Sequence, residues 1–187
     1  MTKPILLSAD DSNMDKKHIV GQHGFTLIEL IVTMAIAAIL VTAAIPSFSE
    51  IIQNNRISAE TNQFIASLQL ARSTAVKQQR NAQICVSTDQ MTCTGTTNWA
   101  SGWIVWVDQD SDSTLDAGEI VRVQAPLNTA SILTSTTQST FRYSATGLVD
   151  NGDTLTFCDN RTGETGRQIT ITATGSVSVA DTPMPCS

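Results

Sequence analysis

The sequence Gly24-Phe25-Thr26-Leu27-Ile28-Glu29 continues into an apolar run that ends at Ile45, and the rest of the chain is organised around this segment. Glu29 is the only charged residue within residues 25–45. A helix over this range is about 30 Å long, which is enough to span the hydrocarbon core of a bilayer. A carboxylate inside hydrocarbon costs about 2.5–3.5 kcal/mol even on lenient insertion scales, so Glu29 indicates a partner for its charge. The alternative is an ordinary signal anchor that carries an incidental glutamate.

This hexapeptide and the apolar run after it resemble the processing and assembly signal of type IV pilins and type II secretion pseudopilins. In that family a prepilin peptidase cleaves after the glycine, the new N-terminal phenylalanine is methylated, and the glutamate pairs with the N-terminal amine of a neighbouring subunit. The resemblance gives these roles to Gly24, Phe25 and Glu29. It implies a leader over residues 1–24, a transmembrane and filament-core helix over residues 25–52, and a periplasmic head over residues 53–187. Such a subunit starts as a single-pass protein of the inner membrane and then enters the pilus at the cell surface.

The leader is polar and has no apolar stretch of its own, so it differs from a secretory signal peptide. Lys16, Lys17 and His18 stand just before the apolar run, which predicts a cytoplasmic N-terminus and an exported head. The leader is long for the family, and Met14 is an alternative start. Removal of the leader takes away equal numbers of acidic and basic residues, so the formal charge of the chain stays at −6. An acidic chain without a basic run does not attract nucleic acid in bulk.

Beyond Pro46 the sequence predicts that the helix continues, over residues 53–79 of the head. Apolar residues recur there at three- and four-residue steps while polar residues occupy the other face, as in an amphipathic helix. We expect the first half of this apolar stripe to pack against neighbouring helices in a filament, and the second half against a sheet of its own domain. The stripe comprises Phe48, Ile51, Ile52, Phe64, Ile65, Leu68, Ala71, Ala75 and Val76.

The remaining residues, 82–187, consist of short β-prone runs separated by Thr, Ser, Gly, Asn and Asp. Such runs predict an antiparallel sheet or small sandwich against the helix, and therefore an α+β fold, which the resemblance implies to be pilin-like. The Ser/Thr-rich stretch 129–140 is open to two interpretations, a loop or a weak strand. The seven predicted strands cover residues 83–87, 102–107, 119–123, 140–143, 154–158, 168–173 and 176–179.

Three further motifs resemble the FimT/FimU and GspH group among the pilin-like proteins. They are residues 70–76 (LARSTAV), residues 99–108 (WASGWIVWVD) followed by 116–119 (DAGE), and residues 166–169 (GRQI). This resemblance implies a minor type IV pilin that primes or tips the filament in pilus biogenesis, with twitching motility or DNA uptake as the process served. The alternative within the class is a GspH-like pseudopilin of type II secretion. The alternative from another class is a membrane-anchored periplasmic Ca²⁺-binding module that does not polymerise.

Four cysteines, Cys85, Cys93, Cys158 and Cys186, lie in the exported part, where disulfides persist. Three pairings are open to them. The most local pairing joins Cys85 to Cys93 and Cys158 to Cys186, and each closure is worth about 3 kcal/mol in the chain-entropy model. A zinc site of four cysteines needs close pairs separated by about two to four residues, which these spacings do not supply.

Catalysis has little support in the sequence. Both histidines, His18 and His23, lie in the leader, and the rest of the chain has neither a Gly-rich phosphate loop nor a zinc-protease motif. Without a histidine there is no imidazole base for a serine or cysteine nucleophile. We therefore expect a protein that is not an enzyme and requires no cofactor.

An acidic loop between two predicted strands has the spacing of a calcium-binding loop. In EF-hand loops the ligands stand at positions 1, 3, 5, 7, 9 and 12, with a backbone carbonyl at position 7. Position 6 is Ser113 where glycine makes the sharp turn, and the flanks resemble strands instead of helices. The loop is therefore a candidate Ca²⁺ site, with a solvated hairpin loop as the alternative. The candidate ligands are Asp108, Asp110, Asp112, Thr114, Asp116 and Glu119.

We expect Arg161 and Arg167 to be exposed, and they are candidate contacts for DNA phosphates, a role that the resemblance to pilins of DNA-uptake systems allows. Affinity for DNA grows with the number of phosphates neutralised, and two arginines beside Asp159 and Glu164 make a weak footprint. We therefore favour protein partners over DNA. The resemblance implies other minor and major pilins, together with the prepilin peptidase.

Overall fold

The computed structural model describes residues 24–116, 118–180, 182 and 184–186 of the 187-residue chain. Of residues 43–47 and 164 it describes the backbone alone. The predicted leader, apart from Gly24, and the alternative start at Met14 lie outside the described residues. The chain divides into two compact units, Met1–Ile45 and Pro46–Ser187, and the helix α1 (Leu27–Gln78) has residues in both.

The N-terminal unit contains the first part of α1, which begins directly after Thr26. Thr26 caps the helix, because its Oγ1 accepts the N–H of Glu29 at 3.2 Å. Glu29 thus lies in the first turn, where the helix dipole favours negative charge. In the part of the chain that the structure describes, no helix has both the length and the apolar character needed to cross a membrane. The membrane span predicted within residues 25–52 therefore stays a prediction.

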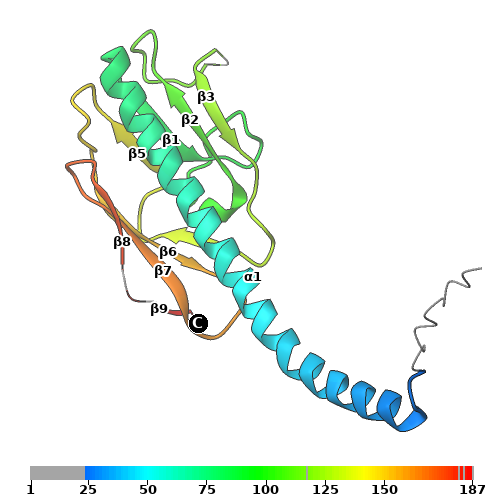
Figure 1. The fold of residues 1–187 in the computed structure, drawn as a ribbon. Helices are drawn as coiled ribbons and strands as arrows, with labels where there is room; N and C mark the ends of the chain where they lie inside the picture. Colours follow the sequence, from blue (N-terminus) through cyan, green and yellow to red (C-terminus); the bar gives the residue numbers. More distant parts are fainter. Residues whose placement is uncertain (1–23, 117, 181, 183, 187) are drawn as a thin grey trace, which may run out of the picture. The chain divides into compact units, whose positions relative to one another are not determined.

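The C-terminal unit packs the second part of α1 against two antiparallel sheets (Figure 1). The first sheet has the strand order β3-β2-β1-β5 and the second β4-β6-β7-β8, with β9 paired to the start of β7. This arrangement confirms the predicted α+β fold with a long helix on an antiparallel head. The strands are β1 (Ala82–Val86), β2 (Trp103–Val107), β3 (Ile120–Gln124), β4 (Ile132–Ser135), β5 (Thr140–Tyr143), β6 (Asp153–Cys158), β7 (Gly163–Ile171), β8 (Val177–Val179) and β9 (Met184–Cys186), and a short 3₁₀ helix, η1 (Trp99–Ser101), precedes β2.

β1 and β2 are buried along their whole length because both faces of their sheet are covered. Successive residues of a strand point to opposite faces. On one face Ile84 joins the main core with α1. On the other face Cys85, Ile104 and Trp106 form a small cluster against which Leu115 packs. Because Leu115 belongs to the loop between β2 and β3, that loop covers part of the outer face of the sheet.

The main core lies between α1 and both sheets. Phe64 of α1 packs edge-to-face against Trp99 and Trp103, with ring centroids 5.2 Å apart in each pair. The second half of the predicted stripe is therefore core, as expected, whereas Phe48 and Ile52 of the first half are 66 % and 54 % exposed. The apolar α1 side chains that are at most 1 % exposed are Ile57, Phe64, Leu68, Ala71 and Ala75.

All seven predicted strands form, six of them with shifted ends, and among the described residues the structure adds two strands that the sequence did not single out. β4 forms in the Ser/Thr-rich stretch because it pairs with β6 and buries Leu133, which decides between the loop and the weak strand. β9 pairs with the start of β7, and the Cys158–Cys186 disulfide ties it to the end of β6. Since β9 pairs with residues 163–166, β7 begins at Gly163 and not at residue 168.

Candidate functional site

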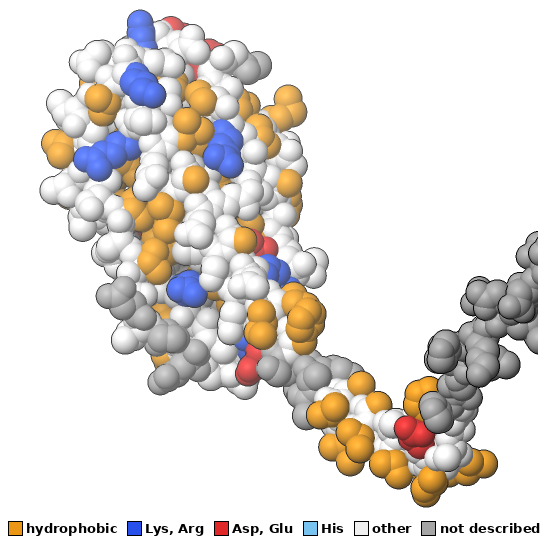
Figure 2. All heavy atoms as spheres, in the orientation of Figure 1, with side chains coloured by type: hydrophobic (Ala, Val, Ile, Leu, Met, Phe, Trp, Pro, Cys, Tyr) orange, Lys and Arg blue, Asp and Glu red, His pale blue; other side chains and the backbone are white. Residues whose placement is uncertain are grey.

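The N-terminal part of α1 presents an apolar surface. Every side chain in residues 24–42 is exposed, and Phe25 and Leu27 are 81 % and 78 % exposed. Figure 2 shows hydrophobic side chains gathered along this part of the chain. A continuous apolar surface of this kind indicates a binding surface for another protein or for lipid.

The three predicted processing and assembly residues lie together at the start of α1. Gly24 and Phe25 precede the first helical residue, so the peptide bond between them stands outside the helix. The side chain of Glu29, in the first turn, is exposed and therefore accessible to a partner. The positions are compatible with cleavage after Gly24 and with pairing of Glu29, and both roles stay predictions.

The acidic loop joins β2 to β3, and it brings together three of its six candidate ligands. Asp108, Asp110 and Asp112 each offer a carboxylate oxygen, and these oxygens lie within 4.8 Å of one another. Asp108, directly after β2, is buried, whereas the other two side chains are exposed. Throughout, we call these three residues the aspartate cluster.

The other three candidate ligands have different partners. The Glu119 carboxylate accepts the N–H of Gln109 through Oε1 and the N–H of Asp116 through Oε2, the latter at 3.2 Å. Thr114 donates its N–H and its hydroxyl to Asp112 Oδ1 at 2.7 Å and 2.6 Å. These two hydrogen bonds hold the pKa of the Asp112 carboxyl below its ordinary value. Within the described residues, the loop therefore does not reproduce the full ligand arrangement of an EF-hand.

Arg161 and Arg167 are only partly exposed, which corrects the expectation of two exposed side chains. Arg161 contacts Asp159 Oδ2 through Nε at 2.8 Å and Nη2 at 2.7 Å, and its Nη1 donates to Asn54 Oδ1 at 3.0 Å. Arg167 donates from Nη2 to Ser58 Oγ at 3.1 Å. Both arginines thus fasten the β6–β7 region to α1.

Asp159 is the reason that Arg161 turns inward. It is 3 % exposed, and burial opposes its charge, but the hydrogen bonds from Arg161 and the charges of Arg161 and Arg56 outweigh burial and lower the pKa of the Asp159 carboxyl. Arg56 completes the group, with Nη2 3.9 Å from Asp159 Oδ2. Because a buried carboxylate already pairs with these cations, the group offers little charge to phosphate, and DNA contact stays unfavoured.

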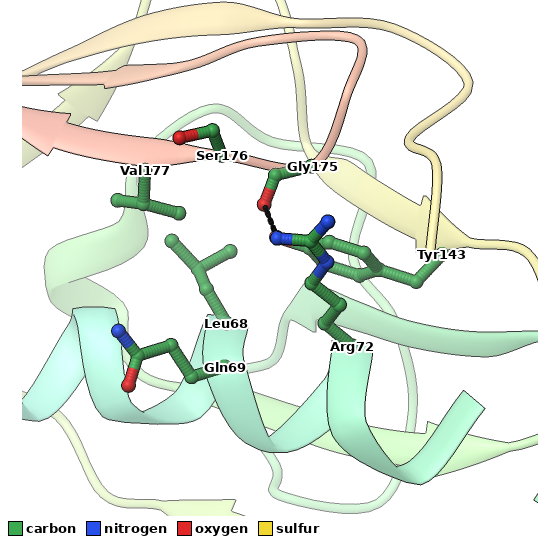
Figure 3. A pocket seen from close by; sticks show the side chains of 7 residues that line it. All are labelled: Leu68, Gln69, Arg72, Tyr143, Gly175, Ser176 and Val177. Atoms are coloured by element: carbon green, nitrogen blue, oxygen red, sulfur yellow. Dashed lines mark hydrogen bonds between the residues drawn. The ribbon is translucent and has the colours of Figure 1, made fainter. Parts of the chain in front are cut away.

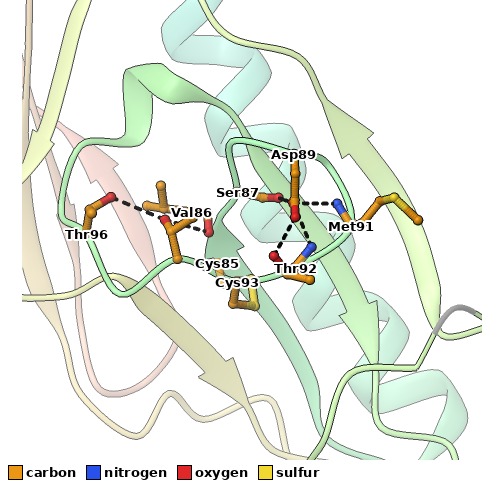
Figure 4. The surroundings of a disulfide bond; sticks show 9 residues. Cys85, Val86, Ser87, Asp89, Met91, Thr92, Cys93 and Thr96 are labelled. Atoms are coloured by element: carbon orange, nitrogen blue, oxygen red, sulfur yellow. Dashed lines mark hydrogen bonds between the residues drawn. A yellow bond between two sulfur atoms is a disulfide. The ribbon is translucent and has the colours of Figure 1, made fainter.

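The structure joins Cys85 to Cys93 and Cys158 to Cys186, which is the most local of the three pairings. Figure 4 shows the first disulfide beside a tight turn that Asp89 organises. Asp89 Oδ1 accepts the N–H groups of Met91 and Thr92 at 2.9 Å and 2.8 Å. The Thr92 hydroxyl, followed by these two N–H groups, holds the pKa of the Asp89 carboxyl well below its usual range. The loop that this disulfide closes is therefore held largely by its own residues.

A pocket of about 180 Å³ lies between α1, β5 and the turn from β7 to β8 (Figure 3). Arg72 enters it and donates to the carbonyls of Gly175 and Thr174 at 3.1 Å and 3.0 Å. Burial raises the pKa of Tyr143 to about 12, although the charge of Arg72 opposes this. The pocket is smaller than the roughly 300–1,000 Å³ of ordinary ligand sites, and its cation already binds two carbonyls. Arg72 therefore fastens the turn to α1, a role that its place in the LARSTAV motif did not reveal.

The groups that the described residues bring together are suited to binding and assembly. Residues 24–187 contain no histidine, so no imidazole stands beside any of the carboxylates or hydroxyls described above. The aspartate cluster is instead a set of oxygen ligands, and the N-terminal helix is an apolar contact surface.

Comparisons with known proteins bear on both ends of the described chain. The family model of the type II transport protein GspH matches residues 60–175, and the model of the prokaryotic N-terminal methylation motif matches residues 20–45. No curated protein matches the chain.

Two crystal structures of the type IV minor pilin FimU from Pseudomonas aeruginosa strain PAO1 have a similar fold. One aligns with a TM-score of 0.54 and 20 % identity, over 71 % of this chain and 96 % of the FimU chain. The other aligns with a TM-score of 0.50 and 21 % identity, over 70 % and 99 %. The predicted pilin-like fold is thereby confirmed. Because the GspH model covers more than half of the sequence, this chain belongs to the GspH family of type II transport proteins.

Proposed function

We propose that this protein is a minor subunit of a type IV pilus, which primes or tips the filament and has no catalytic activity. The observation that carries the proposal is a methylation motif at the start of a helix whose first described turns expose apolar side chains. Such a surface is buried between helices of neighbouring subunits without any need for net charge attraction. FimU, a type IV minor pilin, has the same fold.

In this proposal the prepilin peptidase cleaves after Gly24, and the new amine of Phe25 is methylated. Before assembly the subunit is a single-pass protein of the inner membrane with its head in the periplasm. It then assembles with other minor and major pilins in the pilus. Glu29 pairs with the N-terminal amine of a neighbour, which its exposed side chain allows. The pair neutralises a carboxylate that would otherwise be buried alone among apolar helices.

Replacement of Glu29 tests the pairing. Glu29→Ala removes a charge from the apolar surface, so we expect unchanged membrane insertion and a strong loss from the filament fraction. Glu50→Ala is the matched control, because Glu50 is also an exposed acidic residue of α1 but lies outside the motif. Immunoblots of sheared filaments and of membranes measure both quantities. Equal filament incorporation of the two variants would contradict the amine pairing.

The N-terminus of the mature chain tests the processing step independently. Mass spectrometry of filament material should find a chain that begins at methylated Phe25. A mature N-terminus upstream of Gly24 would remove the basis of the proposal.

A second candidate function is that of a pseudopilin of type II secretion, which the GspH family description favours. Both functions use the same processing and the same helix, so the partner filament separates them. Crosslinking in cells should capture minor pilins if the first proposal holds and secretion-system pseudopilins if the second holds. A processed chain that enters neither filament would favour a membrane-anchored binding module that does not polymerise.

A further inference from the structure

We propose that the loop between β2 and β3 binds one Ca²⁺ ion through the carboxylates of the aspartate cluster, Asp108, Asp110 and Asp112. The three ligand oxygens lie within 4.8 Å of one another. Oxygen ligands bind Ca²⁺ at about 2.3–2.6 Å, so oxygens on opposite sides of one ion are about 4.6–5.2 Å apart. One ion can therefore contact all three carboxylates. Mg²⁺ demands near-ideal octahedral geometry and dehydrates reluctantly, so it is bound less readily than Ca²⁺ by a set of protein carboxylates.

Asp108 gives evidence that is independent of the spacing. The residue is 2 % exposed, and its Oδ1 accepts no hydrogen bond from any residue that the structure describes. Buried polar atoms in native proteins nearly always have a partner. A buried carboxylate oxygen without one has lost its hydrogen bonds to water, and no other contact offsets that desolvation cost. A cation in the aspartate cluster supplies the missing partner of this oxygen.

The negative charge of the three carboxylates also favours the binding of a cation. Three carboxylates at this spacing repel one another, and among the described residues none of them forms a salt bridge. Arg80 faces the loop, but its Nη1 donates to the Ser111 hydroxyl at 3.3 Å. A bound divalent cation therefore relieves the repulsion among the three carboxylates.

The structure assigns Glu119 a positioning role. It is 5 % exposed, and its two oxygens accept the N–H groups of Gln109 and Asp116, near the two ends of the loop. This contact closes the loop and fixes the direction in which the chain leaves Asp108. Asp116 contributes its N–H to that contact, and its exposed carboxylate lies outside the cluster. The protein ligand set is thus smaller than that of an EF-hand, and water and backbone oxygens complete the six to eight ligands of Ca²⁺.

Calcium titration of the full chain, purified in detergent, tests the site. Calorimetry with CaCl₂ should show one site with a dissociation constant of about 10⁻⁴–10⁻³ M, the range of extracellular calcium modules, and Ca²⁺ should raise the Tm by mass action. Asp110→Asn and Asp112→Asn should weaken binding at least about tenfold, because each removes one charged ligand. Both side chains are exposed, so the folded state is expected to survive these changes.

Asp116→Asn is the matched control, because it removes the same charge from the same loop outside the cluster. We expect it to bind Ca²⁺ within about threefold of the unmodified chain, and we expect MgCl₂ to bind at least about tenfold more weakly than CaCl₂. The absence of both heat and a Tm shift at about 5 mM CaCl₂ would overturn the site. Equal losses in Asp116→Asn and Asp110→Asn would overturn the three-residue ligand set, and equal binding of Mg²⁺ would overturn the choice of ion.

Discussion

Replacing Phe64 by alanine tests the packing that holds α1 on the head. The Phe64 side chain is fully buried and lies edge-to-face on Trp99 and Trp103, at 5.2 Å in each pair. A buried Phe→Ala change costs about 3–5 kcal/mol, and an aromatic pair is worth about 0.5–1.5 kcal/mol beyond the area that it buries. Because two pairs are lost at once, we expect a decrease in the free energy of unfolding of about 4–5 kcal/mol. This is a large part of the roughly 5–15 kcal/mol that stabilises a typical domain.

Phe48→Ala is the matched control, since it is the same change in the same helix at a side chain that is 66 % exposed. Surface substitutions usually change stability by no more than about 0.5 kcal/mol. Urea unfolding followed by tryptophan fluorescence measures both variants, because two of the tryptophans contact Phe64. We expect the two losses to differ by at least about 3 kcal/mol at an unchanged m-value. A difference below about 1 kcal/mol would show that this aromatic cluster does not hold α1 on the sheets.

Replacing Cys158 and Cys186 by serine should lower the free energy of unfolding by about 3.5 kcal/mol, and replacing Cys85 and Cys93 should lower it by about 2.5 kcal/mol. In the chain-entropy model the stabilisation grows with the sequence separation of the two cysteines, which is 28 residues in the first disulfide and 8 in the second. Non-reducing urea unfolding measures both, and equal losses would contradict the entropic argument. The lowered pKa of Asp159 means that its contribution to stability is complete above about pH 4 and is lost as the pH falls through the folded-state pKa, so Asp159→Asn should flatten the acid decline of unfolding free energy. An unchanged acid slope would speak against this assignment. Gly175→Ala should lower the stability by at least about 1–2 kcal/mol, because the residue has φ +75° and an added Cβ would collide with the Gly147 carbonyl. A wild-type Tm of that variant would exclude the close contact.

The helix could be predicted well because its signal is local. The three- and four-residue spacing of Phe64, Leu68 and Ala71 describes one face of a helix whatever that face touches, and these side chains are buried. The same stripe did not show where burial begins. Among the α1 side chains that the structure describes, Ile57 is the first that is fully buried. Phe48 has the same apolar character and is exposed, because the sheets cover only the second part of the helix.

The acidic loop could be found from its spacing, but its ligand set could not be read from the sequence. The alternation of carboxylates marked Asp108, Asp110 and Asp112, and these do come together. Glu119 fits the twelfth position equally well by sequence, yet it binds backbone N–H groups. Every residue except proline carries the same backbone N–H donor. The pattern of side chains therefore does not predict which backbone N–H groups will donate to a given carboxylate.

The methylation motif, the long helix, the β-rich head and the excess of acidic charge could be predicted without a structure, because each of these depends on residue types that are close together along the chain. The packing of the whole chain determines which strands share a sheet, makes residues 132–135 a strand, and turns Arg161 and Arg167 toward α1. Arg161 lies 107 residues from Asn54, and Arg167 lies 109 residues from Ser58. Contacts over such separations depend on how the whole chain packs, and a buried carboxylate such as Asp159 selects its cations only after that packing has formed.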